Sequence, residues 1–169
     1  MHADKHSIKM ILEYAQLLST AHRVLDGIQQ ETKTKTGRKS KYWILPDDRE
    51  DMLYSATHIH HPSAIWARQN KSNYIWLANL LVELCEEYTY RYGRTHKVEE
   101  TGLCYVLLKN IPKNINEGQF TGPTPAMPDE CKVPGDSITS YRKYYVQHKR
   151  HLASWQGKVN SRPIPVWYT

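Results

Sequence analysis

The sequence contains a single phenylalanine, only three cysteines and no long run of apolar residues. A membrane-spanning helix needs about 18 or more consecutive apolar residues, and the N-terminus also lacks the apolar stretch of a signal peptide. The cysteines, Cys85, Cys104 and Cys131, are odd in number and far apart, so they predict neither a disulfide framework nor a CxxC metal site. These absences favour a protein without membrane segments in a reducing, cytoplasmic setting.

Tyrosine and tryptophan are abundant by contrast, with twelve and five copies in 169 residues. Both side chains keep a polar group that needs water, a partner or a ligand. The chain is also basic, because 23 Lys and Arg exceed 17 Asp and Glu to give a formal net charge of +6. This combination favours a polyanionic partner, and the length fits one domain over 1–169 that can bury a core.

Apolar residues recur at helical spacing in several segments of the chain. The first long segment is amphipathic and has Gly27 at its end, whereas the central one is apolar around most of its circumference, which is typical of a buried helix. The predicted helices cover 4–26, 73–92 and 137–155, with shorter helices after Pro46, from Pro62 and over 98–109.

No segment shows the alternation of apolar and polar residues that is typical of a strand. The predicted fold class is therefore all-α: a compact single-domain helical bundle with long ordered loops. Three segments are expected to lie outside helices: a basic loop over 28–46, a loop over 112–135 with five of the nine prolines, and a tail rich in proline and aromatic residues over 161–169.

Basic residues gather in the first of these loops and on the last helix. The stretch KTKTGRKSK at 33–41 has the charge density to neutralise phosphates, and Tyr42-Trp43 directly after it could stack on a base or wedge into a duplex. A solvated loop without a partner would show the same composition. We expect duplex DNA as the partner, with these DNA-binding residues: Arg23, Lys33, Lys35, Arg38, Lys39, Lys41, Tyr42, Trp43, Arg142, Lys143, Lys149 and Arg150.

Histidines cluster in two places, His2 with His6 on one helix face and three more at 58–61. The spacing of the first pair could ligate zinc, but no acidic residue follows His2 in an HExxH-like pattern. Capping or hydrogen-bonding histidines are the favoured interpretation, so no metal or other cofactor is expected. A metal enzyme that acts on nucleotides or DNA bases through His6 and 58–61 is kept as an alternative.

Glu13 lies in the middle of the first predicted helix, one turn after Lys9. A carboxylate on a helix that faces a DNA groove can hold or protonate a sugar oxygen. An ordinary surface ion pair with Lys9, worth about 0.3–0.5 kcal/mol, explains the same spacing.

Three stretches resemble the phage pyrimidine-dimer DNA glycosylase/AP lyases of the endonuclease-V type. ADKHSIKMILEYAQ at 3–16 is similar to the opening helix of that family, 73–93 to its long core helix with an Arg-x-Gly ending, and RPIPVWYT at 162–169 to its aromatic C-terminal segment. The segment with DKH and LLSTAHRVLDG, at 4–27, is also similar to proteins of tailed phages. The resemblance implies a phage gene whose product works in the cytoplasm of the host cell.

The resemblance further implies a compact all-α domain that cleaves the glycosidic bond at a damaged or modified pyrimidine in duplex DNA, after a nucleotide is flipped out. An amine attacks the sugar C1′ to form a Schiff base, and strand scission follows. Glu13 then stabilises or protonates the opened sugar, and His6 lies near the site. The amine is that of Met1, Lys5 or Lys9. A non-catalytic protein that binds DNA or nucleotides on the same fold is the alternative hypothesis.

Overall fold

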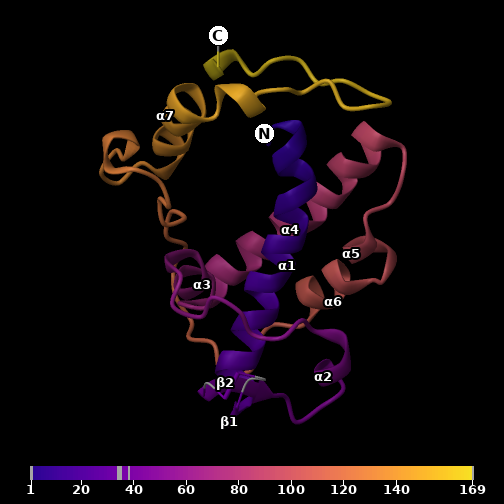
Figure 1. Ribbon diagram of the computed structural model, residues 1–169, viewed down its shortest axis with the longest axis vertical. Helices are drawn as coiled ribbons and strands as arrows, with labels where there is room; N and C mark the ends of the chain where they lie inside the picture. The colour runs from indigo at the N-terminus through magenta and orange to yellow at the C-terminus, as the bar shows by residue number, and fades with distance from the viewer. Residues whose placement is uncertain (1, 34–35, 38, 169) are drawn as a thin grey trace.

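The computed structural model describes residues 2–33, 36–37 and 39–168 of the chain (Figure 1). The fold is mainly helical but includes a small two-stranded antiparallel sheet, which corrects the all-α prediction. Among the described residues, no helix is both long and apolar enough to cross a membrane. The helices and strands are α1 (Asp4–Asp26), β1 (Ile28–Lys33), β2 (Lys39–Ile44), α2 (Arg49–Met52), α3 (Pro62–Ala67), α4 (Lys71–Tyr92), α5 (Lys97–Glu100), α6 (Leu103–Lys109) and α7 (Ser137–His148), with short 3-10 turns η1 (Asp129–Cys131), η2 (Arg150–Leu152) and η3 (Val166–Tyr168).

Helices α1 and α4 cross at the centre of the molecule, and α3, α5 and α6 pack around them (Figure 1). Their buried apolar side chains form one core, to which α1 contributes Ile11 and Leu18, α4 contributes Leu81, and α6 contributes Leu107. The bounds predicted for α1 are confirmed, and α4 begins two residues before the predicted 73–92. Gly93 ends α4 with a φ of 64°, a left-handed conformation that glycine adopts without strain.

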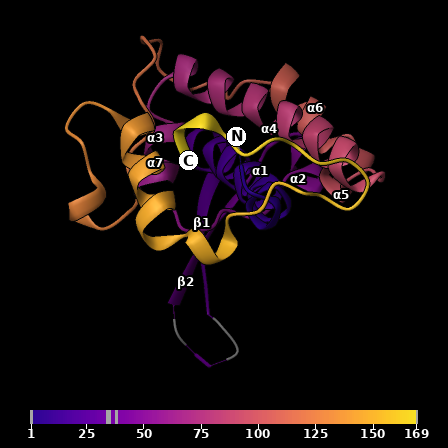
Figure 2. The same ribbon diagram turned by 90° about the horizontal axis from the view of Figure 1, so that it is seen from above.

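The segment predicted as a basic loop is instead an antiparallel hairpin of β1 and β2. Figure 2 shows this hairpin projecting away from the helical body. Every residue of β1 is exposed, and most of β2 is exposed or half-buried. The alternation that reveals a strand in a sequence arises when one face is buried. Because both faces of most of this hairpin contact solvent, the pattern is absent from the sequence.

The last two helical predictions are shorter in the structure. The helix predicted over 98–109 is divided into α5 and α6 at Gly102, whose φ is 74°. The helix predicted over 137–155 ends at His148, and the chain then turns through η2. The proline-rich 112–135 segment has no regular element except η1, as predicted, and Thr121 within it binds the side chains of Trp66 and Asn73.

The C-terminal tail is held across the N-terminal end of α1 by a buried ion-pair network. Arg91, which is fully buried near the end of α4, pairs with Asp4 at 3.0 Å and with Glu87 at 2.6 Å. Asp4 also accepts a hydrogen bond from Ser154 Oγ, and Glu87 accepts three from Nε and Nη2 of Arg162. Consequently α7, the tail and the start of α1 lie at the same end of the molecule (Figure 1).

Candidate nucleic-acid interface

The hairpin presents its lysines on one face. Side chains alternate along a strand, and residues paired across the two strands share a face. The register pairs Lys33 with Lys39 and Glu31 with Lys41, so three exposed ammonium groups project from the same face. Outside the described residues lie three predicted site residues: Met1, Lys35 and Arg38.

The two aromatic residues of β2 have different surroundings. Tyr42 lies on the face opposite the lysines, is 39% exposed, and donates a hydrogen bond from its hydroxyl to Gln30 Oε1 over 2.6 Å. Trp43 is only 9% exposed at the base of the hairpin. Tyr42 can therefore meet a ligand. Trp43 is largely buried but lines an open pocket beside the hairpin, so its contact with DNA stays a prediction.

Arg23 is also buried, which corrects its assignment to the DNA-binding set. Its side chain is about 5% exposed and forms an ion pair with Glu50 at 2.7 Å. The guanidinium also donates to the main-chain carbonyl oxygens of Trp43, Glu50, Leu53 and Tyr54. All of these acceptors are internal, so Arg23 anchors the base of β2 to the segment after α2.

An open pocket of about 470 Å³ lies beside the hairpin. Lys39 and Lys41 line one side of it, and Thr57 and His58 line the other. The backbone of His58 has a φ of 48°, a conformation that residues other than glycine seldom adopt, and its ring is hydrogen-bonded to Thr57 Oγ1 over 2.8 Å. Ammonium and hydroxyl donors around an open hollow are the groups that bind phosphate oxygens.

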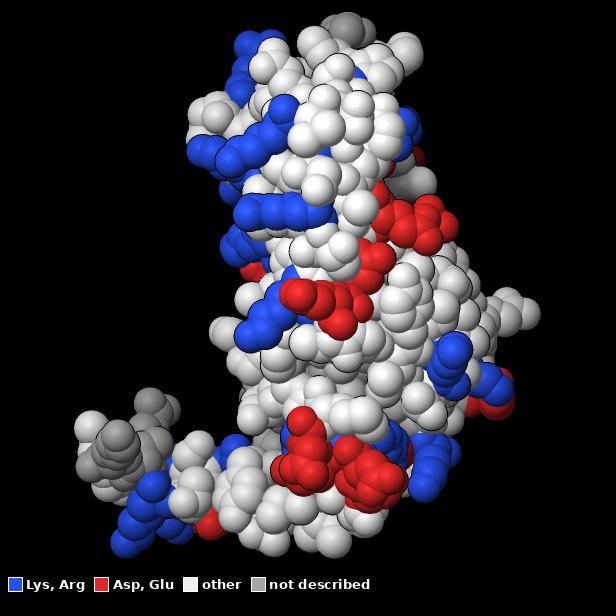
Figure 3. Space-filling view, turned by 90° about the vertical axis from the view of Figure 1, so that its right-hand side faces the viewer, with Lys and Arg blue, Asp and Glu red and all other residues white. Residues whose placement is uncertain are grey.

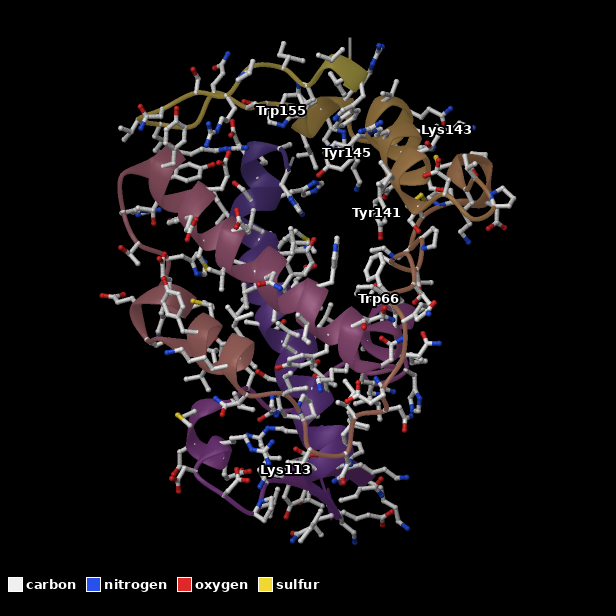
Figure 4. All side chains as sticks on the ribbon, turned by 180° about the vertical axis from the view of Figure 1, so that it is seen from behind. Trp66, Lys113, Tyr141, Lys143, Tyr145 and Trp155 are labelled. Carbon is white, nitrogen blue, oxygen red and sulfur yellow. The ribbon has the colours of Figure 1, made fainter. Side chains whose placement is uncertain are left out.

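The predicted cations of the last helix lie on α7 and just beyond it. The Arg142 guanidinium is 5.8 Å from the centre of the Trp167 ring, and the Lys149 ammonium is 5.0 Å from that of Tyr144. Lys143 and Arg150 are exposed. Figure 4 shows Lys143 on the outer side of α7 and Tyr145 on its inner side.

Helices α1 and α7 meet at His6, whose Nδ1 is hydrogen-bonded to the Tyr145 hydroxyl. Burial lowers the pKa of His6, and the positive charges of Lys149 and Lys9 lower it further. Lys9 of α1 and Lys149, directly after α7, thus both act on the same imidazole and favour its neutral form. This contact brings the basic end of α7 next to the predicted catalytic turn of α1.

Glu13 and Lys9 form the ion pair that their spacing predicts. Their charged groups are 2.9 Å apart, and the side chains are 39% and 69% exposed respectively. The negative charge of Glu13 also acts on His6, so Lys9, Glu13 and His6 are neighbours on α1. Lys5, one turn before Lys9, is exposed. The structure thus brings together four of the predicted catalytic residues on the surface of α1.

Among the residues that the structure describes, neither histidine cluster forms a group able to hold a metal ion. His2 bonds to the Tyr14 hydroxyl at 2.9 Å, and burial lowers its pKa to about 4. His61 caps α3 by accepting a hydrogen bond from the Ser63 amide, as the capping interpretation predicts. Within the described part of the chain, the residues close enough to hold a metal ion together are Glu130, Cys131 and His148. Sequence reasoning missed them, because no local spacing connects η1 with the end of α7.

Several of the cations follow one edge of the molecule. Figure 3 shows Lys and Arg side chains along the edge of the helical body above the projecting hairpin, and further ones on the hairpin itself. The hairpin and the body meet at an angle in this view, so the outline between them is concave. We call the hairpin lysines Lys33, Lys39 and Lys41, together with Lys9 and Lys149 beside His6, the basic face.

Comparisons with known proteins give no match: no protein-family model, curated protein or solved structure is significantly similar to the chain. The likeness to pyrimidine-dimer glycosylases stays a prediction from short stretches of sequence. The geometry of the basic face is therefore the feature that points to a function.

Proposed function

We propose that the protein binds duplex DNA through its hairpin and the rest of the basic face. The observation that carries this proposal is the exposed two-stranded ribbon with three lysines on one side. The major groove of B-DNA is about 12 Å wide and admits a two-stranded ribbon. Lys33 and Lys39 are direct neighbours across the ribbon, and Lys41 lies about 7 Å further along it, so the three ammonium groups form one cluster that can contact adjacent phosphates.

Packing does not account for the length of the hairpin, which supports a binding role. A two-stranded hairpin alone is marginally stable in water, and β1 buries none of its residues against the helices. An element that adds little to the core and projects its charges into solvent is suited to contact a partner. Lys9 and Lys149, beside His6, offer further contacts to the phosphates that flank the groove.

The proposal is tested by measuring the affinity for a fluorescent DNA duplex over a series of salt concentrations. Each phosphate contact contributes about 0.9 to the slope of log K against log salt. Replacing Lys33, Lys39 and Lys41 by Gln should reduce that slope by roughly 2–3 and weaken binding about a hundredfold near physiological salt. The matched control replaces the exposed residues Lys97, Lys109 and Lys158 by Gln, which changes the net charge equally.

An equal loss of affinity in the hairpin variant and the control would show a general charge effect and would contradict groove binding. Tighter binding to single-stranded DNA or to RNA duplex than to DNA duplex would contradict the choice of partner. The A-form RNA duplex has a deep, narrow major groove that a ribbon of this kind cannot enter.

A second candidate function is AP-lyase chemistry at Lys9, which the 2.9 Å contact between Lys9 and Glu13 favours. The amine condenses with the C1′ aldehyde of an abasic site to an iminium with loss of water. Glu13 is in position to accept the proton that the ammonium loses first, because acid and amine are within hydrogen-bond reach. The neighbouring cations would hold the phosphates beside the abasic sugar.

Borohydride trapping on a duplex with one abasic site tests this second function. A covalent adduct should form with the native chain and with Lys5→Gln, and should be absent with Lys9→Gln. An adduct that persists in Lys9→Gln would assign the reaction to another amine. Unchanged DNA binding with no adduct in any variant would favour the non-catalytic alternative.

A further inference from the structure

Glu130, Cys131 and His148 bring a carboxylate, a thiol and an imidazole together at the outer end of α7. The ligand atoms of all three lie within 4.8 Å of one another. His148 Nε2 is 3.2 Å from Glu130 Oε1, and Cys131 Sγ donates to Gln147 Oε1 over 3.2 Å. Cys131 is fully buried, whereas the His148 and Glu130 side chains are 40% and 60% exposed. The thiol therefore lies beneath two groups that face solvent.

The fold fixes the approach of η1 to α7 without any ion. Asp136 caps α7 by accepting hydrogen bonds from the amide and hydroxyl of Thr139. Ser140, which is fully buried on the first turns of α7, accepts a hydrogen bond from the Val133 amide through Oγ. The connection between η1 and α7 is thus held at both of its ends, so the three ligand groups are positioned before a ligand binds.

We propose that Glu130, Cys131 and His148 bind a divalent transition metal ion of the zinc type. Thiolate, imidazole and carboxylate are the three ligand types that zinc takes in proteins. Bond lengths of about 2.0–2.3 Å place tetrahedral ligand atoms roughly 3.3–3.8 Å apart. His148 Nε2 and Glu130 Oε1 are 3.2 Å apart, and Cys131 Sγ lies within 4.8 Å of the ligand atoms of both. Three protein ligands leave a fourth position for water or for Gln147 Oε1.

The charges around the site suit a divalent cation. One thiolate and one carboxylate balance the two positive charges of the ion. His148 is the last residue of α7, where the carbonyl ends of the helix favour positive charge. Two lysines lie near Cys131: Lys132 is paired with Asp129 over 2.7 Å, and Lys143 extends its exposed side chain from the outer side of α7 (Figure 4).

The metal would connect the 112–135 segment to the last helix, away from the hairpin. Its ligands come from η1 and from the end of α7. Among the described residues, Glu130 is the one further potential ligand that lies within reach of both Cys131 and His148. The site is independent of the proposed DNA contacts through the hairpin, so either proposal can fail without the other.

Cobalt and zinc titrations of the full chain, after treatment with a chelator, test the proposal. Cobalt bound to a thiolate gives a charge-transfer band in the near ultraviolet, and a tetrahedral site gives a strong visible band. We expect one equivalent of either ion to bind. Zinc at about a hundred times its dissociation constant should raise the melting temperature by roughly 5–10 °C.

Variants assign the ligands. Cys131→Ser should abolish the charge-transfer band, and His148→Gln, a change at the surface that leaves the core intact, should weaken zinc binding at least tenfold. Cys104→Ala and His151→Gln are the matched controls, because they remove a thiol and an imidazole outside the group and should leave the band unchanged.

Three results would overturn the proposal. The first is failure of either ion to bind the native chain. The second is a band that survives in Cys131→Ser or unchanged affinity in His148→Gln, with circular dichroism confirming that the variant is folded. The third is stoichiometric binding that is lost in His6→Gln, which would place the ion in the N-terminal histidine cluster instead.

Discussion

The buried arginines and the hairpin lysines use the same charge in opposite ways. Arg23, Arg49 and Arg91 are 4%, 9% and 0% exposed, and each donates to several carboxylate or carbonyl oxygens. Lys39 and Lys41 are exposed on a ribbon that projects into solvent. A guanidinium has five donors in a rigid plane, which match fixed internal acceptors, whereas an ammonium on a flexible stem is strongly hydrated.

Because the arginines are buried and paired and the lysines are exposed, the lysines dominate the electrostatic field outside the protein. Arg91 is balanced by Asp4 and Glu87, and Arg49 forms ion pairs with Asp26 and Asp47. A basic composition is therefore a poor guide to where a polyanion binds until the paired cations are set aside. Stability should depend on the arginines, and DNA binding should depend on the lysines.

The largest expected effect is the loss of stability when Arg23 is replaced by Met. The change removes the ion pair with Glu50 and leaves the carbonyl oxygens of Trp43 and Leu53 without their donor. Breaking a buried network in this way costs about 3–5 kcal/mol in the free energy of unfolding, measured by urea denaturation.

Arg150→Met is the matched control for Arg23→Met, because Arg150 is exposed. It should change the free energy of unfolding by no more than about 0.5 kcal/mol. If Arg23→Met does not fold, Arg23→Lys provides the measurement, and it should still be destabilised since an ammonium cannot reach the same set of acceptors. Native stability in both Arg23 variants would contradict an anchoring role.

The next effect is a pH dependence from His22, which lies in the buried arginine region. Tyr74 donates its one hydroxyl hydrogen to the Leu107 carbonyl, so the Tyr74 oxygen can only accept from His22. The hydrogen of the neutral imidazole is therefore on Nε2, and Nδ1 accepts a hydrogen bond from Arg49 Nη1. A proton on Nδ1 would face that guanidinium. Burial and then the charge of Arg49 lower the pKa of His22 from 6.5 to about 4 in the native state.

The unfolded chain therefore binds the proton first as the pH falls. The stability due to neutral His22 is complete above pH 6.5 and is lost between pH 6.5 and 4, by about 3 kcal/mol. Urea denaturation at pH 7 and pH 5 should show a smaller decrease for His22→Gln than for the native chain. His151→Gln, at an exposed position, should keep the native decrease. Equal decreases in the native chain and His22→Gln would exclude His22 as the cause.

Shortening the hairpin separates the two regions most directly. Gln30 pairs with Tyr42, so replacing 31–41 by Asn-Gly connects these partners through a two-residue turn in the native register. The free energy of unfolding should change by less than about 1 kcal/mol, because those of the removed residues that the structure describes lie in the projecting part of the hairpin. Affinity for the DNA duplex should fall about a hundredfold, measured by fluorescence anisotropy.

The contradicting outcomes for the shortened hairpin lie in opposite directions. Native DNA affinity would place the binding surface elsewhere. A loss of stability comparable to that of Arg23→Met would mean that the projecting part of the hairpin supports the core. The hydrogen bond from Tyr42 to Gln30 should form in the shortened chain as it does in the native one, so the base of the hairpin should be the same in the native and the shortened protein.

The features that the sequence predicts well are those with local causes. The bounds of α1, the end of α4 at Gly93 and the cap at His61 depend on neighbouring residues alone. The hairpin was missed because solvent on both faces removes the alternation of a strand. The burial of Arg23 and Trp43, and the meeting of Cys131 with His148, depend on contacts between distant segments, for which one sequence carries no spacing.

The smallest expected effect concerns Glu13, where the site hypothesis and an ordinary surface ion pair make different predictions. Both partners of the pair are well exposed, so a double-mutant cycle with Glu13→Gln and Lys9→Gln should give a coupling free energy of about 0.3–0.5 kcal/mol that disappears in high salt. A coupling above about 1 kcal/mol that survives salt would contradict a solvent-screened pair. Because this contribution to stability is small, a loss of the borohydride adduct in Glu13→Gln at native stability and native DNA affinity would assign the carboxylate to the reaction and not to the fold.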